Sequence, residues 1–199
     1  MHPHNHHFSA FRAFISKKVA LTEQEWFITT QGLELLRCKA NTVLLKEGQI
    51  CGHLYFLNQG LMRFFVVGAD GKDTTKFFTL EHQLFSSQQS FSTQAPATEN
   101  IEALENSEII ALSHAHLQIL YDEIPKWHTF IRRVLQEVNM MTERIYMESI
   151  TTTAEERYRK LLRDEPNIAQ RAALKHIASY LGVTPESLSR IRKKLAVHE

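Results

Sequence analysis

The chain has 199 residues, of which 43% are hydrophobic, and a formal net charge of +1. That apolar share is enough for a buried core, so the composition excludes a largely disordered chain. No apolar run approaches the length needed to cross a bilayer, and the first residues lack the apolar stretch of an export signal. We therefore expect a cytoplasmic protein that does not act at a membrane.

The near-neutral total hides an uneven distribution of charge along the chain. Residues 1–150 hold 13 Lys or Arg against 16 Asp or Glu, a balance of −3, whereas residues 151–199 hold 10 against 6, a balance of +4. A basic segment attracts a phosphate backbone. We predict two domains with these bounds, the second of which is small and basic.

Cysteine and histidine usage gives little support to a metal or redox site. Cys38 and Cys51 are too few for a disulfide framework and lack the spacing of a thiolate metal site. The N-terminal residues His2, His4, His6 and His7 could ligate a transition metal, but a chain end offers no fixed geometry. We expect inert thiols and no metal site, and the sequence identifies no cofactor.

The elements expected in the first domain change from helical to extended along the chain. Residues 8–36 are predicted to be helical, with Thr22 and Glu25 as a capping box. Short runs rich in aromatic and branched residues then predict strands at 43–45, 53–57, 61–67, 74–78, 101–104 and 109–112. Gly48, Gly60 and Gly71 supply the turns between them. Such closely spaced strands predict an antiparallel barrel or jelly roll, with one polar loop between residues 85 and 98.

A long helix is predicted at about residues 124–150. Its apolar residues recur at alternating intervals of four and three, as at heptad positions a and d: Trp127, Ile131, Val134, Val138, Met141 and Ile145. The stripe forms a dimer seam if it faces a second chain. Packing on the roll of its own chain is the alternative, and fewer than three full heptads do not decide between the two. Reading two successive major grooves of DNA takes paired modules, so a DNA-binding function favours the dimer.

The C-terminal residues have the spacing of a helix-turn-helix. Thr153 and Glu156 form a second capping box, and Pro166 ends the helix that this box starts. Apolar residues at helical spacing then lead to Gly182, which can adopt the left-handed conformation that ends a helix. Thr184 and Pro185 restart a helix at once as N-cap and first residue.

The last helix is expected to have one apolar and one hydrophilic face. Its hydrophilic face carries donors and acceptors that suit base edges in a major groove: Glu186, Ser187 and Arg190. The phosphate backbone is expected to be held by Arg171, Lys175, Ser189, Arg192, Lys193 and Lys194. A solvated surface helix is the alternative, but the turn spacing favours DNA binding.

This order of elements resembles the CRP/FNR family of bacterial transcription regulators over about residues 21–195. The resemblance rests on Gly48, Tyr55-Phe56-Leu57, Gly60, Gly71, Ile177-Ala178-Ser179-Tyr180-Leu181-Gly182 and Glu186-Ser187-Leu188-Ser189-Arg190. It implies an α+β chain: an antiparallel β-roll with flanking helices, a long dimerisation helix and a small all-α helix-turn-helix domain. It further implies a homodimer that reads a two-fold-related site in double-stranded DNA without catalysis, and it allows RNA polymerase as a further partner.

The recognition helix departs from the family pattern at its first residue. The family's common Arg-Glu-Thr-Val pattern begins with an arginine, and this chain has Pro185 there. One guanine contact should therefore be missing. The chain also leaves no room for the β-hairpin wing of many winged relatives, so the phosphate-binding residues are expected to clamp the backbone.

The ligand region also departs from the family pattern. Members that bind cyclic AMP have a Gly-Glu pair and, about ten residues later, an arginine that neutralises the cyclic phosphate. These positions hold Ser86-Ser87 and Ala97 here, and no Lys or Arg occurs between residues 83 and 100. Cyclic AMP is therefore not the expected effector. The remaining candidates for an effector pocket are Ser86, Ser87, Gln88 and Thr98, and the alternative is a pocket that binds nothing.

Other sensing chemistries and function classes receive less support. Two cysteines cannot hold the iron-sulfur cluster of the oxygen-sensing branch. Haem would need an axial ligand, for which the sequence offers only weak candidates: His53, His82, His114 and His116. The spacing of His114 and His116 also allows a metal-dependent cupin-like enzyme, although the glycine expected before such a pair is absent. A sensor that signals through a protein partner is a third alternative.

Overall fold

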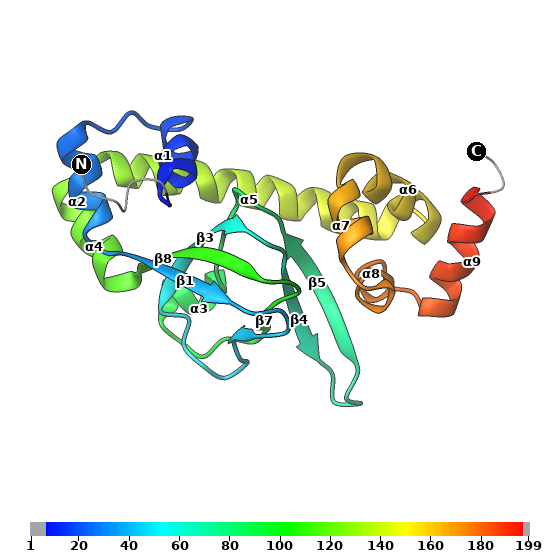
Figure 1. Ribbon diagram of the computed structural model, residues 1–199. Coiled ribbons are helices and arrows are strands. Elements are labelled where there is room, and N and C mark those ends of the chain that lie inside the picture. Colours follow the sequence, from blue (N-terminus) through cyan, green and yellow to red (C-terminus); the bar gives the residue numbers. More distant parts are fainter. Residues whose placement is uncertain (1–6, 197–199) are drawn as a thin grey trace.

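Two four-stranded antiparallel sheets form the N-terminal part of the chain, as shown by a computed structural model that describes residues 7–196 (Figure 1). One sheet has the strand order β1 (Leu33–Cys38), β8 (Ser107–Ser113), β3 (His53–Gln59) and β6 (Leu84–Phe85). The other has the order β2 (Val43–Leu45), β7 (Asn100–Ala103), β4 (Met62–Val67) and β5 (Asp73–Thr79). Every strand pairing is antiparallel, so the predicted antiparallel roll is confirmed.

Glycines close two of the tight turns of the roll. Gly60, between β3 and β4, has φ +116, and a Cβ added there would lie 2.1 Å from Oγ of Ser107. Gly71 has φ +77 in the β4–β5 hairpin. A residue with a side chain would be strained at both positions. The glycine spacing in the sequence therefore reports the positions of these turns correctly.

The prediction that residues 8–36 are helical is wrong at its C-terminal end. Two helices form, α1 (Ser9–Ser16) and α2 (Glu23–Thr30), and α2 begins with the predicted capping box of Thr22 and Glu25. The leucines that follow lie on β1, where Leu33 pairs with Leu112 of β8. This segment is a strand because it pairs with another strand almost eighty residues later in the chain. Local residue spacing does not reveal such a pairing.

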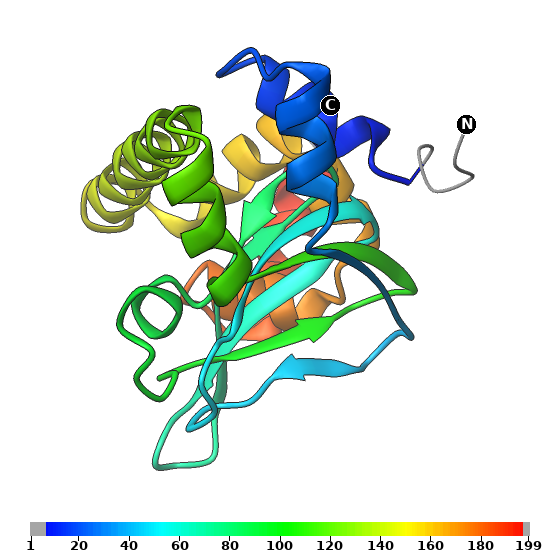
Figure 2. The ribbon, with the colours of Figure 1, turned by 90° about the vertical axis from the view of Figure 1, so that its left-hand side faces the viewer.

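Three further helices complete this part: α3 (Gln88–Thr93) in the polar loop, α4 (His114–Glu123) and the long α5 (Lys126–Thr151). Helix α5 runs along the roll from the N-terminal helices to the C-terminal ones (Figure 1), and a view along it shows α1, α2 and α4 around its first half (Figure 2). Trp127 donates a hydrogen bond from Nε1 to Oγ1 of Thr29, and Nζ of Lys126 lies 2.7 Å from Oε2 of Glu25. No helix among residues 7–196 is both long and apolar enough to cross a membrane.

Four short helices follow: α6 (Ala154–Asp164), α7 (Pro166–Arg171), α8 (Leu174–Tyr180) and α9 (Pro185–Ala196). Helix α6 begins with the predicted capping box of Thr153 and Glu156, and Pro166 is the first residue of α7. Their apolar residues form a second core, which also includes residues of the roll: Leu61, Phe78, Leu80 and Leu104. The C-terminal helices therefore share a core with the roll.

Candidate nucleic-acid interface

The turn between α8 and α9 has the geometry that the sequence predicts. Gly182 has φ +70, and the backbone N–H of Val183 donates to the carbonyl of Ala178 over 3.0 Å. This pattern closes the end of α8, because it satisfies a carbonyl that the helix itself leaves free. Oγ1 of Thr184 then accepts from the backbone N–H of Ser187 over 3.2 Å and caps α9. The two helices form a helix-turn-helix.

One face of α9 is buried and the other is free. Leu188 and Leu195 are buried against α8 and its neighbours, with Ile191 beside them. The opposite face carries Glu186, Arg190 and Lys193, all of which are exposed. Figure 1 shows α9 at the end of the molecule farthest from α1 and α2. A duplex could therefore approach the charged face.

The polar residues at the start of α9 contact one another. Oγ of Ser187 accepts from Nη2 of Arg190 over 3.3 Å and lies 3.2 Å from Oγ1 of Thr184. Hydrogen bonds from its own backbone N–H and from Thr184 lower the pKa of Glu186. Glu186 is therefore an ionised acceptor at neutral pH, which suits the exocyclic amine of cytosine. Ser187 is half-buried and contacts Arg190 directly.

The residues predicted to bind phosphate have different surroundings. Lys175, Arg192 and Lys193 are exposed, while Ser189 is half-buried. Lys194 is exposed as well, but its Nζ lies 2.7 Å from Oε2 of Glu155 on α6. An exposed ion pair of this kind contributes little, so it leaves Lys194 able to exchange partners.

Arg171 departs from the sequence-based expectation. It lies at the end of α7, and its guanidinium makes ion pairs with Glu81 and Glu105 of the roll, at shortest distances of 2.7 and 2.5 Å. These carboxylates occupy donors that a phosphate would need. The prediction that Arg171 contacts DNA therefore conflicts with its place in the structure.

Helix α8 packs on strand β5 of the roll. Oγ of Ser179 accepts from the backbone N–H of Thr75 over 3.1 Å and lies 2.8 Å from Oγ1 of the same residue. The rings of Phe78 and Tyr180 meet edge to face with centroids 5.4 Å apart. His176 is buried beside them, and this burial, together with the charge of the nearby Arg63, lowers the pKa of His176 to about 4. The first helix of the helix-turn-helix thus faces the roll, while the second faces outward.

The candidate effector residues differ in burial. Ser86 is half-buried, Ser87 is buried, and Gln88 and Thr98 are exposed. The hydroxyl of Ser87 donates to Oε1 of Glu99 over 2.9 Å. The sequence predicted the four candidates but not Glu99, the partner of Ser87.

Glu99 is the residue of this region that sequence reasoning missed. Its side chain is only 9% exposed, and it forms an ion pair with Lys76, which reaches it from β5. The segment from residue 83 to residue 100 does lack Lys and Arg, but a cation arrives from another strand and neutralises Glu99. A buried acid beside a serine gives no distinctive spacing in the sequence, so no local signal could identify it.

Two residues of the predicted dimer seam are buried within their own chain. Trp127 and Val134 are 1% and 9% exposed and belong to the chain's own core, which leaves them little surface for a second chain. Ile131 and Val138 pack partly on the same core, and Ile145 is half-buried. Only Met141, at 42% exposed, is largely free. The heptad stripe therefore faces mainly the roll and the N-terminal helices.

A neighbouring stripe of α5 is exposed instead. Leu135 and Tyr146 are 37% and 63% exposed, and Ile150 continues the stripe at 61%. At about 100° per residue, these side chains lie beside Ile131 and Val138 and on the flank that the roll leaves free. This stripe is a candidate contact surface that the heptad pattern alone did not reveal.

The histidines and cysteines do not converge on a metal site. His2, His4 and His6 lie outside the described residues, and Nδ1 of His7 lies 3.3 Å from Oε1 of Glu108. No group of three or more His, Cys, Asp or Glu within residues 7–196 is arranged to hold a metal ion. Both cysteines are free, and burial raises the pKa of each, as expected for inert thiols.

The four weak haem candidates are dispersed over the roll. His53 lies on β3, His82 lies between β5 and β6, and His114 and His116 lie in the first turn of α4. A cupin-like site would need the last two on a strand. The ring of His116 also packs directly against the backbone of Gly32, where a Cβ would approach it to 2.1 Å. The structure therefore gives no support to the enzyme alternative.

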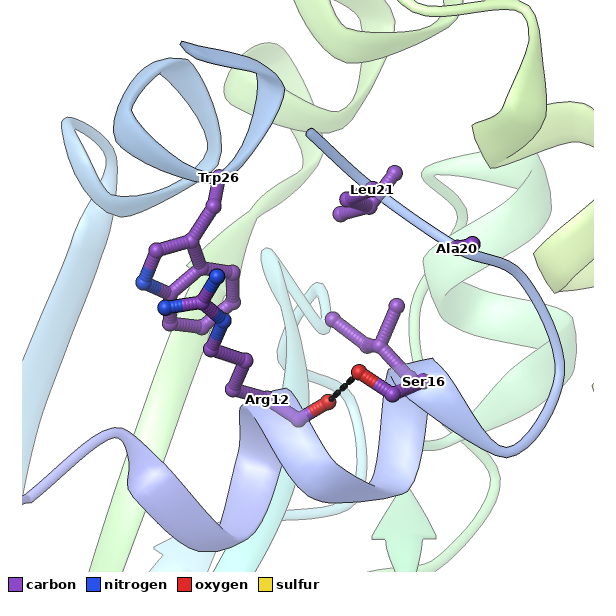
Figure 3. A pocket seen from close by; sticks show the side chains of 6 residues that line it. Arg12, Ser16, Ala20, Leu21 and Trp26 are labelled. Carbon is purple, nitrogen blue, oxygen red and sulfur yellow. Dashed lines mark hydrogen bonds between the residues drawn. The ribbon is translucent and has the colours of Figure 1, made fainter. Parts of the chain in front are cut away.

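A small cavity lies between α1 and α2 (Figure 3), which Figure 1 places at the opposite end of the molecule from α9. Its volume is about 130 Å³, and its lining consists of Arg12, Ile15, Ser16, Ala20, Leu21 and Trp26. The Arg12 guanidinium lies 5.3 Å from the centre of the Trp26 ring and forms an ion pair with Glu23. The cavity could hold one small ring at most, and its cation already has a partner.

Comparison with known proteins agrees with this architecture. Residues 35–123 match the family model of the cyclic nucleotide-binding domain. No curated protein matches the sequence. FixK2 from Bradyrhizobium japonicum superposes with a TM-score of 0.74 at 16% identity, over 83% of this chain and 85% of the other. The c-di-GMP responsive global regulator CLP from Xanthomonas campestris superposes with a TM-score of 0.71 at 17% identity, over 89% and 93%.

A protein described as a transcriptional regulator of the crp/fnr family, from Eubacterium rectale, also has a TM-score of 0.71, at 14% identity over 89% of this chain and 85% of the other. A roll of this class, a long helix and a helix-turn-helix define a two-part fold. The chain has the fold found in CRP/FNR-family transcription regulators, and its residues 35–123 are similar to the cyclic nucleotide-binding domain family. The resemblance inferred from the residues is thereby confirmed.

Proposed function

We propose that this protein is a transcription regulator that binds double-stranded DNA as a homodimer and performs no catalysis. One observation carries the proposal: α9 turns an exposed face with Glu186, Arg190 and Lys193 to solvent, while its apolar face is buried. Both helices of a helix-turn-helix are present, and the second helix, α9, is the accessible one, as a recognition helix must be. The structural neighbours described as regulators support the same function.

Each exposed residue of α9 has a chemical role in this proposal. Arg190 can donate two hydrogen bonds to one guanine, and Glu186 can accept from cytosine. Lys193, Arg192 and Lys175 can hold phosphates. Because Pro185 provides no donor, the half-site should lack one of the guanine contacts made by relatives with an arginine there.

The proposed dimer uses the exposed stripe of α5 together with the edge of the heptad stripe that borders it. Leu135, Tyr146 and Ile150 would lie along this surface, with Ile131 and Val138 at its inner edge. Residues this apolar and this exposed are typical of a surface that another chain covers. Two copies related by a two-fold axis would present two α9 helices, so the half-sites should lie about 10 bp apart, centre to centre.

Cyclic AMP does not fit the roll as its effector. Ala97 stands where the family's phosphate-binding arginine should be, and two residues later the buried carboxylate of Glu99 holds the Ser87 hydroxyl. A cyclic phosphate placed next to it would have to compete with the Glu99 carboxylate for Lys76, because no Lys or Arg lies between residues 83 and 100. Helix α3 has six residues and gives no substitute. We infer that DNA binding does not depend on a cyclic nucleotide.

Addition of 1 mM cyclic AMP is therefore expected to leave the melting temperature unchanged. A ligand with a dissociation constant of about 10 μM would stabilise the folded state by about 2.7 kcal/mol at this concentration, which corresponds to a rise of about 5 °C or more. Differential scanning calorimetry distinguishes the two results. A saturable rise with cyclic AMP, absent with 5′-AMP, would show that the roll accepts the cyclic phosphate.

DNA recognition is tested with a duplex selected from a random pool, in which we expect a two-fold repeat. Arg190→Ala should weaken binding to that duplex by about 1 to 3 kcal/mol and leave binding to random DNA almost unchanged. Lys193→Ala should weaken both equally and lower the salt slope by about 1, because it removes one phosphate contact.

Binding titrations at several salt concentrations measure both quantities. Equal loss on selected and random DNA for Arg190→Ala would contradict its role in reading bases. If the wild-type chain is not retained by any DNA at low salt, the protein is better explained as a sensor that acts through a protein partner.

A further inference from the structure

Two loops of the roll meet at the guanidinium of Arg171, and a third is joined to one of them. Its Nη1 and Nη2 donate to the two carboxylate oxygens of Glu81 over 3.0 and 2.7 Å. Its Nε and Nη2 donate to those of Glu105 over 3.2 and 2.5 Å. Glu81 follows β5 and Glu105 lies between β7 and β8. One side chain of α7 therefore holds two separate loops with paired, charge-assisted hydrogen bonds.

The third loop is joined through Glu81. Its Oε1 also accepts from the backbone N–H of Gly60, over 3.1 Å, in the β3–β4 turn. The hydrogen bonds from Arg171 lower the pKa of Glu81 to about 2, so the carboxylate stays ionised at neutral pH. The next residue of this turn, Leu61, is fully buried in the core shared with the C-terminal helices. The ionic and apolar contacts thus lie side by side at one end of the roll.

This junction lies at the base of the helix-turn-helix. Only Ala172 and Ala173 separate Arg171 from the first residue of α8. Helix α8 in turn packs on β5 through Ser179 and Thr75, and on α9 through its apolar face. Because the link to α8 is short and α8 packs on α9, a shift of Arg171 would also move α9.

We propose that Arg171 is a positioning residue, which holds the helix-turn-helix on the roll in one orientation through Glu81 and Glu105 and does not contact DNA. The inference rests on the proposed function, because its consequence concerns two α9 helices in a dimer. A fixed orientation keeps the spacing of the two reading faces matched to two half-sites. Freedom at the junction would have to be lost on binding, which lowers affinity.

The test compares Arg171→Met with the double variant E81Q/E105Q. Both remove the ion pairs, so both should weaken binding to the selected two-half-site duplex by about fivefold or more. Binding to a duplex with a single half-site and the salt slope should be unchanged. In the triple variant the losses should not add, because all three side chains act in one contact.

A role of Arg171 in phosphate binding would give the opposite pattern. Arg171→Met would then lower the salt slope by about 1, and E81Q/E105Q would bind DNA as well as or better than wild type, because it frees the arginine. Either result overturns the proposal. Lys175→Met is the matched control, because Lys175 is an exposed cation near Arg171. Its removal should lower the salt slope of DNA binding and leave the contacts of Arg171 with Glu81 and Glu105 unchanged.

Hydrogen exchange of the full chain without DNA provides a second measurement. The amides of Gly60 and Thr75 donate to Glu81 and Ser179, so both should exchange faster in Arg171→Met and in E81Q/E105Q, but not in Lys175→Met. Unchanged protection at both amides would contradict the proposal even if the protein binds no DNA. Faster exchange in a chain that binds no DNA would support the junction and reject the proposed function instead.

Discussion

Replacing Leu135 with Glu is expected to separate the proposed dimer and to weaken binding to the two-half-site duplex by about 100-fold or more. The side chain is 37% exposed on the free stripe of α5, which also carries Tyr146 about three helical turns further along. Across a two-fold axis the two new carboxylates would face each other or the same apolar patch, which disfavours association. A monomer loses the gain in avidity from the second half-site, which is typically 10²- to 10⁴-fold.

Sedimentation velocity at micromolar concentration measures the dissociation directly, and binding to a single half-site reports whether α9 remains intact. Met140→Glu is the matched control, because Met140 lies on the same helix, is 68% exposed and points away from the free stripe. If both variants remain dimeric, the contact between copies lies elsewhere. If both dissociate, the contact surface includes the Met140 face and is wider than the stripe proposed here.

The helix-turn-helix could be predicted because its signals are local. Gly182 adopts φ +70 without the strain that a side chain would bring, and Thr184 caps a helix through its own neighbour Ser187. The capping boxes at Thr22 and Thr153 are equally local and were also predicted correctly. The turns at Gly60 and Gly71 are local in the same way, so the roll could be recognised from the glycines that separate its strands.

What the sequence could not determine depends on residues far apart in the chain. The heptad stripe of α5 is apolar whether it meets a second chain or its own roll, and Trp127 and Val134 meet the roll. Periodicity gives the face of a helix but not the surface that covers it. Leu33 was placed on a helix for the same reason, because its partner Leu112 is distant in the sequence.

Charged residues show the same limit at the candidate sites. Arg171 is one basic residue in a basic segment, and nothing nearby marks its pairing with Glu81 and Glu105. Glu99 takes its counter-ion Lys76 from β5. In both cases an ion pair joins elements that only the fold brings together, so composition gives the charge balance but not the use of each charge.

Replacing Arg63 with Met is expected to lower the free energy of unfolding by about 3 to 5 kcal/mol, since removal of one partner leaves the others with poorly compensated charge. The Arg63 side chain on β4 is 2% exposed and donates to Glu102 over 2.6 Å and to both oxygens of Asp73 over 2.5 and 2.6 Å. Its guanidinium also lies over the ring of Phe65, 4.2 Å from the centre. The Glu102 side chain is only 15% exposed, whereas Asp73 is 42% exposed, which places the expected loss near the lower value.

Urea denaturation followed by tryptophan fluorescence measures this loss. The triple variant R63M/D73N/E102Q should recover part of it, because it leaves no charge without a partner. Arg159→Met removes an exposed partner of Glu155 one helical turn away and should leave the unfolding free energy almost unchanged. A loss as small for Arg63→Met as for Arg159→Met would contradict the view that Arg63 organises this face. Thr75 accepts from Arg63 and contacts Ser179 of α8, so that face is the one on which the helix-turn-helix rests.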